Sequence, residues 1–506
     1  MQRRIIMDVP QAVEKLMDLQ SEMSAYRHAL SILYTDGVTV APKGTTANRS
    51  HTMGILNEAM YKLSTGEETI SLLEFLDAHR DELDKKQARM VYLLLKGNRE
   101  LKKIPMDVYL EYQRLLVEGD ALWHDAKENS DFALFEPVLA RIFDLTKKMA
   151  AFVEPEKDPY DYWLDKYERG LTKASCDKFF GVLKERLVPL IAKIAEKPQV
   201  DYSFLHGDFP AWQQEKLAYK LMDIIGIDRD HCALSTTEHP FTTSYGSHYD
   251  VRITTNYRPH KLDPSMFSVI HEGGHAMYEM GSDDELAYTV LDGGASMSIH
   301  ESQSRFYENI CGRSFGFISR ILPVIKECFP GKLDDVTPEQ FYKAINKVEP
   351  SFIRIDADEV TYCMHVMVRY ELEKQIFAGT LEVKDLPAAW NALMKEYLGI
   401  DVPDDKHGVL QDSHWANGNI GYFPSYALGS AYGAQFLTKM KKDIDADKAL
   451  AEADFTEINV WNREHIWKYG SLYEPNELLA MLLPEGFDPN IYADYLEKKY
   501  SEIYGL

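Results

Sequence analysis

Cysteine is scarce in this sequence, and none of it is paired. Five cysteines are scattered along 506 residues, an odd number, and no C-x-x-C spacing occurs. Such usage fits reduced thiols in a cytoplasm, most of them buried as small hydrophobic side chains, rather than a disulfide framework. We therefore expect a cytoplasmic protein.

Long hydrophobic runs are also missing. Residues 1–20 contain two arginines but no long apolar stretch after them, and they alternate charge with hydrophobe as an amphipathic helix would. Neither a secretory signal nor a transmembrane span has this pattern. We expect no membrane partner.

Positive charge is in deficit. The chain has 80 acidic residues against 56 Lys and Arg, a formal net charge of -24, and no basic patch interleaved with aromatic residues. Such a surface repels phosphate backbones, so nucleic acid is not expected as a partner.

Helical periodicity is what the sequence has in abundance. Apolar residues recur at spacings of three and four, with charges between them, and helices are expected again at 173–225 and from 264 onward. No internal repeat, low-complexity segment or long linker interrupts the pattern. The sequence predicts one large, mostly helical body whose first helices cover residues 8–35, 51–65, 68–98, 106–129 and 132–152.

Residues 232–257 differ in composition. They are rich in Thr, Tyr and β-branched residues, and Tyr245-Gly246-Ser247 offers a turn between two extended runs. This predicts a small antiparallel sheet in an otherwise helical protein.

The segment His271-Glu272-Gly273-Gly274-His275 is an H-E-x-x-H motif. On a helix, residues four apart share a face, so both imidazoles can reach one metal ion, while Glu272 can reach a metal-bound water. The pattern predicts a zinc-dependent peptidase with Glu272 as general base.

The helix around the motif has recognisable ends. Asp263 is a good N-cap, Pro264 suits the first helical position, and Gly281 can end the helix. Two adjacent glycines inside a helix each cost roughly 1 kcal/mol relative to Ala. We infer that a neighbouring helix or a substrate approaches the backbone closely at the motif.

Catalytic zinc takes three protein ligands and keeps one position for water, so a third ligand is needed. Glu301 lies early on a helix expected at 295–311, which an antiparallel packing would bring to the metal. We favour it over a plain surface carboxylate paired with Arg305 at i+4. The other downstream candidates are Glu279, Asp283, Asp284, Glu285, Asp292 and His300.

Several segments, in this order along the chain, resemble the carboxypeptidase Taq family of zinc metallocarboxypeptidases. They are HPF at 239–241, DVRIT at 250–254, HEGGH at 271–275, HESQ at 300–303, IRIDAD at 353–358 and GVLQDSHW at 408–415. The resemblance implies a cleft-forming helical peptidase similar to the neurolysin and angiotensin-converting enzyme folds. It also implies removal of single C-terminal residues with broad specificity, usually by a homodimer, and it places the third zinc ligand at Glu301.

The expected mechanism combines the metal with donors late in the chain. His271, His275 and Glu301 would hold Zn²⁺, for which Co²⁺ or Mn²⁺ could substitute, and Glu272 would take a proton from the metal-activated water. Related zinc peptidases suggest that a Tyr or His stabilises the oxyanion. Tyr426 and His414 are the favoured candidates, and Tyr422 is a further one; the alternative is that these tyrosines only form local hydrogen bonds in the core.

Substrate binding is assigned to arginines and to the strand-rich segment. Arg354 is the candidate for bidentate recognition of the terminal carboxylate, the alternative being a salt bridge to Asp356 or Asp358. Residues 239–254 are expected to line the cleft and to offer an edge to an extended peptide, with His239 and Arg252 as substrate contacts. For Arg252 the alternative is a pair with Asp250.

These expectations define one peptidase domain over 1–506. Residues 1–130 would form a helical region that covers the cleft as a lid, and 231–430 would carry the active site. The competing functions are an endopeptidase or dipeptidase on the same fold, and a catalytically silent binding protein that kept its metal site. The intact Glu272 argues against the silent protein.

Overall fold

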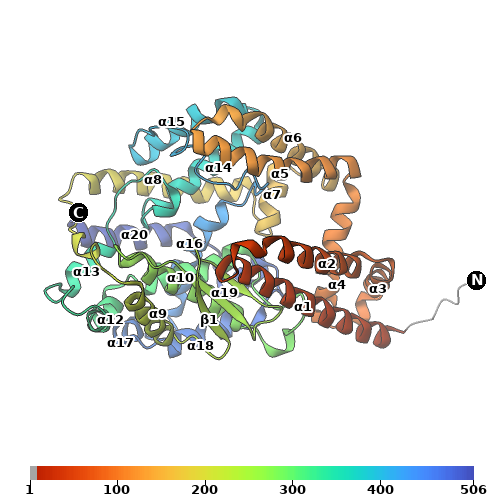
Figure 1. Cartoon of the computed structure of the whole chain (residues 1–506), viewed down its shortest axis with the longest axis horizontal. Helices are drawn as coiled ribbons and strands as arrows, with labels where there is room; N and C mark the ends of the chain where they lie inside the picture. Colours follow the sequence, from red (N-terminus) through yellow and green to blue (C-terminus); the bar gives the residue numbers. More distant parts are fainter. Residues whose placement is uncertain (1–7) are drawn as a thin grey trace, which may run out of the picture.

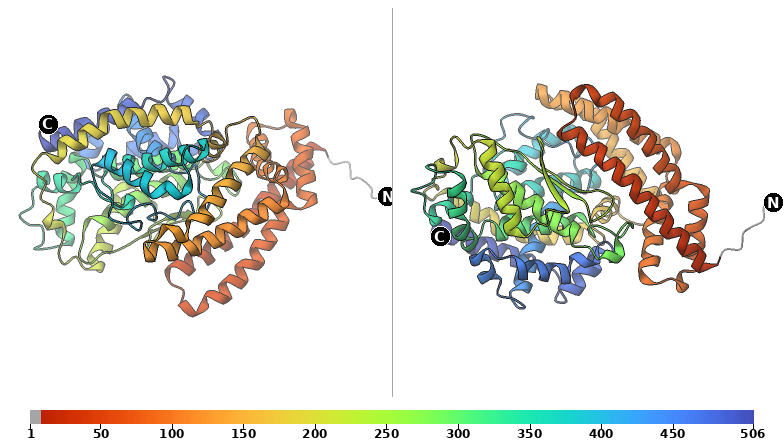
Figure 2. Two further views of the ribbon diagram at one scale, coloured as in Figure 1. Left: turned by 90° about the horizontal axis from the view of Figure 1, so that it is seen from above. Right: turned by 60° about the horizontal axis from the view of Figure 1, so that its bottom comes forward.

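The computed structural model describes residues 8–506, and its N-terminal helices lie together at one side of the molecule (Figures 1 and 2). Residues 1–7 of the predicted amphipathic segment lie outside this range. Helix α1 begins beside Asp8, whose side chain accepts a hydrogen bond from the Gln11 amide. The helices of this region are α1 (Val9–Thr39), α2 (Thr46–Thr65), α3 (Glu67–Ala78) and α4 (Lys85–Lys103). No helix of the described part is long and apolar enough to cross a membrane.

The prediction of one helix over 68–98 is wrong, because the chain breaks between α3 and α4. Asp84 starts the second helix through a capping box, in which its carboxylate accepts from the Gln87 amide while the Gln87 side chain accepts from the Asp84 amide. This local pair satisfies backbone donors at a new helix start, and the apolar periodicity runs across the break without marking it.

Five further helices lead into the strands; Figure 1 shows α5 and α6 at the top of the view and α9 in its lower part, beside β1. They are α5 (Met106–Asn129), α6 (Glu136–Val153), α7 (Pro159–Tyr167), α8 (Lys173–Ala195) and α9 (Ala211–Ile225).

The sheet is mixed, not antiparallel as predicted. Its strands are β1 (Cys232–Thr236), β2 (Thr242–Ser244) and β3 (Val251–Thr255), in the order β1-β3-β2. A loop over residues 245–250, in which Gly246 has a φ of 76°, joins β2 and β3, and the two strands are antiparallel as expected. However, β3 lies between the other two strands and pairs with β1 in parallel, with Cys232 opposite Val251. The turn residues determine only the β2–β3 pair.

The motif helix is α10 (Asp263–Met280), and it ends at Gly281 as predicted. Asp263 is not its N-cap: it is the first helical residue, follows Leu262 in the cap position, and makes no capping hydrogen bond. Helix α11 (Met297–Arg305) then continues into a π-helical turn, η6 (Phe306–Cys311).

Helices also form the rest of the chain. They are α12 (Phe315–Cys328), α13 (Pro338–Ile345), α14 (Tyr362–Ala378), α15 (Leu386–Leu398), α16 (Pro424–Met440), α17 (Ala446–Glu452), α18 (Thr456–His465), α19 (Pro475–Leu482) and α20 (Pro489–Tyr504).

Two hydrophobic clusters hold these elements. The large one extends from Tyr112 to Tyr504 and includes the buried faces of α10, α11 and α16. The smaller one joins α1, α3 and α4 to Leu286 and Leu291, in the loop between α10 and α11. The N-terminal helices are therefore anchored to the loop that leads into α11.

Candidate metal centre

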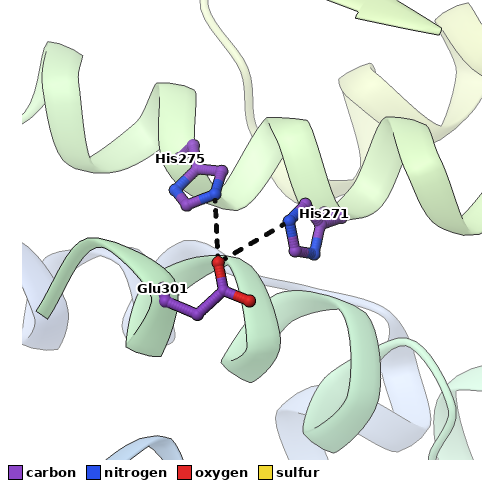
Figure 3. Close-up of side chains that lie close together, drawn as sticks. All are labelled: His271, His275 and Glu301. Carbon is purple, nitrogen blue, oxygen red and sulfur yellow. Dashed lines mark ion pairs between the residues drawn. The ribbon is translucent and has the colours of Figure 1, made fainter. Parts of the chain in front are cut away.

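His271, His275 and Glu301 meet between two packed helices. The imidazoles lie one turn apart on α10, and Glu301 faces them from α11 (Figure 3). The Nε2 atoms of His271 and His275 are 3.9 and 3.6 Å from Glu301 Oε2, and one ligand atom of each residue lies within 4.8 Å of the others.

This donor set fits a divalent metal. Tetrahedral ligands at 2.0–2.2 Å from zinc are separated by about 3.4 Å, close to both measured distances. Burial lowers the pKa of His275 to about 4, so the ring is in the neutral form that binds metals.

The other nitrogen of each ring is already engaged. His271 Nδ1 is 2.9 Å from Glu308 Oε2, and His275 Nδ1 is 2.7 Å from His300 Nδ1. The candidate ligand His300 therefore contacts a ligand histidine and does not join the cluster. With both Nδ1 atoms occupied, the Nε2 atoms are the ones left to face a metal.

Glycines bring the helices close enough for this arrangement. A Cβ at Gly274 would lie 2.7 Å from Gln303 O and 2.8 Å from Ser304 Cα, so α11 packs directly on the α10 backbone. From the opposite side, a Cβ at Gly429 on α16 would lie 2.6 Å from Glu301 Cβ. The close approach that the glycine pair predicted is that of a neighbouring helix, and α11 is held between two glycine-bearing helices.

Glu301 combines both roles considered for it. Its Oε1 accepts a 2.6 Å hydrogen bond from Arg305 Nε, the i+4 pair, while Oε2 faces the histidines. The arginine fixes one oxygen and orients the other toward the metal position.

Glu272 is buried beside the ligands, and Thr242 on β2 holds it. Thr242 Oγ1 lies 2.7 Å from Glu272 Oε2 and donates to it. Burial raises the pKa of Glu272, opposed by the nearby His271 and by this hydrogen bond. A carboxylate with a raised pKa suits a group that takes up a proton near neutral pH. Sequence reasoning missed Thr242, because a threonine in a strand carries no sign of the helix that it contacts.

Arg354 is buried, and the alternative that it pairs with Asp356 or Asp358 is wrong. Its partner is Asp412, 2.9 Å from NH2 to Oδ1 and 3.3 Å from Nε to Oδ2. Arg369, fully buried, shares the same carboxylate through Nε at 2.7 Å. Burial alone would raise the pKa of Asp412, but the charges of Arg369 and Arg354 outweigh it and hold the pKa below its ordinary value.

This arginine cluster adjoins the metal position through Tyr362. Arg354 NH1 donates to the Tyr362 hydroxyl at 3.1 Å, and Arg305 Cζ lies 4.3 Å from the centre of the same ring. Since Arg305 also binds Glu301, one continuous set of contacts links Arg354 to the candidate ligand.

Tyr426, His414 and Tyr422 gather at the same place. His414 Nε2 is 3.3 Å from the Tyr426 hydroxyl, and the Tyr422 and Tyr426 rings are 5.0 Å apart. The Tyr426 ring lies 5.0 Å from Arg354 Cζ, one helical turn before Gly429. Burial lowers the pKa of His414 to about 4 and raises the pKa of Tyr426 above its ordinary value, so both are neutral at pH 7.

Arg252 and His239 are not brought into this cluster. Arg252 pairs with Asp250 through Nε at 2.5 Å and NH2 at 3.0 Å, and its guanidinium lies over the Tyr245 ring. The pair with Asp250 is the alternative that the sequence offered for this arginine. His239 is exposed in the loop between β1 and β2. Neither residue contacts Glu272 or the candidate ligands.

Other contacts of the centre escaped sequence reasoning for lack of a local signal. Glu308, Asp412 and Arg369 act on partners 37, 58 and 43 residues away in the chain. Asp412 lies in the segment GVLQDSHW at 408–415, one of those that resemble the family, so its contact with Arg354 was the easiest of the three to suspect from the sequence.

A mostly helical fold with this site is that of a metallopeptidase, and the chain matches the family model of the carboxypeptidase Taq (M32) metallopeptidases over residues 15–500. The chain belongs to this family. It is 37% identical to Carboxypeptidase 1 of Bacillus subtilis (strain 168), over 99% of this chain and 100% of that protein. It is 36% identical to Thermostable carboxypeptidase 1 of Pyrococcus furiosus, over 97% and 98% of the two chains.

Solved structures agree with this assignment. The M32 carboxypeptidase from Deinococcus radiodurans R1 superposes with a TM-score of 0.94 at 32% identity, covering 98% of this chain and 100% of that one. The Pyrococcus furiosus carboxypeptidase gives a TM-score of 0.92 at 35% identity, with coverage of 98% and 100%. The protein is a metallocarboxypeptidase, a peptide hydrolase that uses a divalent metal.

Proposed function

We propose that this enzyme removes single amino acids from the C-termini of peptides, with Zn²⁺ held by His271, His275 and Glu301. The observation that carries the proposal is the charge of the buried cluster beside the metal position. Two guanidiniums, Arg354 and Arg369, share the single carboxylate of Asp412, so one positive charge is left over. A buried excess charge is costly without a counter-ion, and a peptide's terminal carboxylate supplies one.

Arg354 still has donors for that carboxylate. A guanidinium has five N–H groups, and Asp412 takes one from Nε and one from NH2. The remaining N–H groups are on NH1 and NH2, along the edge of the guanidinium whose NH1 also donates to the Tyr362 hydroxyl. We infer that a substrate carboxylate binds this edge, with Arg369 and Asp412 fixing the guanidinium plane.

Glu272 acts as the general base in this scheme. Zinc, when bound, polarises the scissile carbonyl and acidifies a water molecule. Thr242 occupies Glu272 Oε2, which leaves Oε1 to accept the proton from that water and to deliver it to the leaving amine.

Tyr426 is the oxyanion donor that the contacts favour. Its hydroxyl lies beside His414 Nε2, and the helix that bears it packs on Glu301 through Gly429. Because burial keeps this tyrosine protonated, its O–H can donate to an oxyanion as charge develops.

We infer broad specificity from the pocket beside Arg305, which we propose receives the C-terminal side chain. Its lining includes Arg305, Glu308, Tyr362 and residues 356–358. The lining carries both signs of charge, and therefore offers partners to polar, basic and acidic C-terminal side chains without selecting one strongly.

The test is a pool of free-acid peptides with their amidated counterparts, incubated with zinc-loaded protein and analysed by mass. We expect a ladder of single C-terminal losses from the free acids only. A chelator and Glu272→Gln should each abolish it. Equal cleavage of the amidated peptides would refute the role of Arg354 and favour an endopeptidase; metal binding without any cleavage would refute peptide hydrolysis by this site.

A further inference from the structure

His275 differs from His271 in what supports its ring. His271 Nδ1 contacts a carboxylate directly, Glu308 at 2.9 Å. His275 Nδ1 instead contacts a second imidazole, His300 Nδ1 at 2.7 Å, and His300 Nε2 contacts Glu279 Oε1 at 2.6 Å. The two candidate ligands are thus supported by chemically different partners.

Only one arrangement of protons satisfies these contacts with neutral rings and a metal at His275 Nε2. A ring that binds metal through Nε2 carries its hydrogen on Nδ1, which must donate. His300 Nδ1 is then an acceptor, so its hydrogen lies on Nε2 and donates to Glu279. The hydrogen bonds run in one direction, from His275 through His300 to Glu279.

We propose that His300 and Glu279 are positioning residues that hold His275 in its metal-binding tautomer and orient its ring, through this two-step chain of hydrogen bonds. The inference rests on the proposed metal site, not on the proposed cleavage reaction. Partners of this kind orient metal ligands and raise their basicity.

The surroundings leave His300 little freedom to turn. Its ring lies against the Tyr278 ring, with centres 5.0 Å apart. A Cβ at Gly294 would lie 2.6 Å from His300 Cδ2 and 2.8 Å from Tyr278 Cε1, and a Cβ at Gly293 would lie 3.4 Å from Glu279 Oε2. The two glycines before α11 therefore make the space in which His300 and Glu279 meet.

Glu279 belongs to this device and not to the metal cluster. Glu279 lies one turn beyond His275 on α10, and His300 on α11 bridges the two through its hydrogen bonds. Burial alone would raise the pKa of Glu279, but hydrogen bonds with His300 and Ser244 and the nearby imidazoles together outweigh burial and lower the pKa. The carboxylate therefore remains an acceptor for His300.

Two substitutions at His300 separate hydrogen bonding from filling of space. In His300→Gln, the amide oxygen can accept from His275 and the amide NH₂ can donate to Glu279, which reproduces the direction of the chain. In His300→Leu, neither contact can form. Glu279→Gln and Glu279→Leu make the same comparison from the other end.

The measurement is the zinc affinity of the full chain by competition with a chromogenic chelator, without peptide. We expect His300→Leu to bind zinc about 10- to 100-fold more weakly than the natural sequence, and His300→Gln to recover most of that loss. The absorption spectrum of bound Co²⁺ should change in His300→Leu and be restored in His300→Gln. Thermal unfolding of the metal-free variants identifies any that do not fold. If a His300 variant does not fold, the comparison of Glu279→Gln with Glu279→Leu replaces it.

The inference is overturned if His300→Leu binds zinc as tightly as the natural sequence, or if His300→Gln loses as much affinity as His300→Leu. If the unmodified chain binds no divalent metal, the proposed metal site itself is wrong. Failure to cleave peptides, with affinities in the expected order, would refute the proposed function and leave this inference standing.

Discussion

The glycine contacts around α11 predict that one added methyl group will damage the metal site. In Gly274→Ala, the new Cβ would lie 2.7 Å from Gln303 O, whereas ordinary contacts begin near 3.4 Å. The obstructing atoms are backbone, so α11 must retreat from α10 by about 0.7 Å. Ligand distances in a working metal site tolerate about 0.2 Å, so Glu301 would be displaced beyond what zinc accepts.

The stability change follows from two opposing effects. Overpacking of this kind costs about 1–3 kcal/mol, while replacing a helical glycine with alanine gains about 1 kcal/mol. We therefore expect Gly274→Ala to lower the free energy of unfolding of the metal-free protein by about 0–2 kcal/mol. Zinc affinity should fall at least tenfold, since 1.4 kcal/mol of strain at the site corresponds to that factor.

Gly181 provides the matched control. It lies inside α8 and has nothing within 4 Å of an added Cβ, so Gly181→Ala should stabilise the protein and leave zinc binding unchanged. Gly429→Ala presses on Glu301 from the opposite helix and should also weaken binding. Urea unfolding and chelator competition measure both quantities. If Gly274→Ala matches Gly181→Ala in both, the helix spacing does not control the site.

Three further perturbations test the charges and the metal. Glu272→Gln should keep zinc affinity within a few fold while kcat falls by about 10²–10⁴, measured on a free-acid peptide; a kcat within tenfold of normal would show that another group is the base. Asp412→Asn leaves Arg354 and Arg369 buried without their carboxylate and should cost about 3–5 kcal/mol at pH 7. Because the folded-state pKa of Asp412 is depressed, its contribution is present above about pH 4 and is lost as pH falls further, so the difference between the two proteins should narrow below pH 4; a constant difference would contradict this. Zinc at 100 times its Kd should add about 2.7 kcal/mol to the free energy of unfolding, and chelation should remove it.

Local patterns in the sequence were enough to predict the helical class and the core of the site. The i,i+4 spacing of His271 and His275 gives one helical face, because helix geometry depends only on neighbours along the chain. The paired glycines Gly273 and Gly274 predicted a close contact with the backbone, but not which element makes it. Glu301 was selected from seven candidates by its place on the next helix, and that helix lies where the prediction put it.

The predictions of the fold from sequence were wrong where a local capping motif breaks a helix, and where strands that do not follow each other in the chain pair. The capping box at Asp84 splits a predicted helix, because one pair of side-chain hydrogen bonds outweighs a continuing apolar pattern. The strand order β1-β3-β2 depends on where β1 docks, which alternation within each strand does not encode.

The sequence alone thus determined the metal-binding pattern, the family resemblance and the helical class, since each depends on residues close together or on segments matched one by one. Only the tertiary structure decided that Arg354 faces Asp412, that Thr242 holds Glu272, and that His300 stands between His275 and Glu279. Each of these contacts joins separate elements, and its geometry follows from how closely the helices and strands pack.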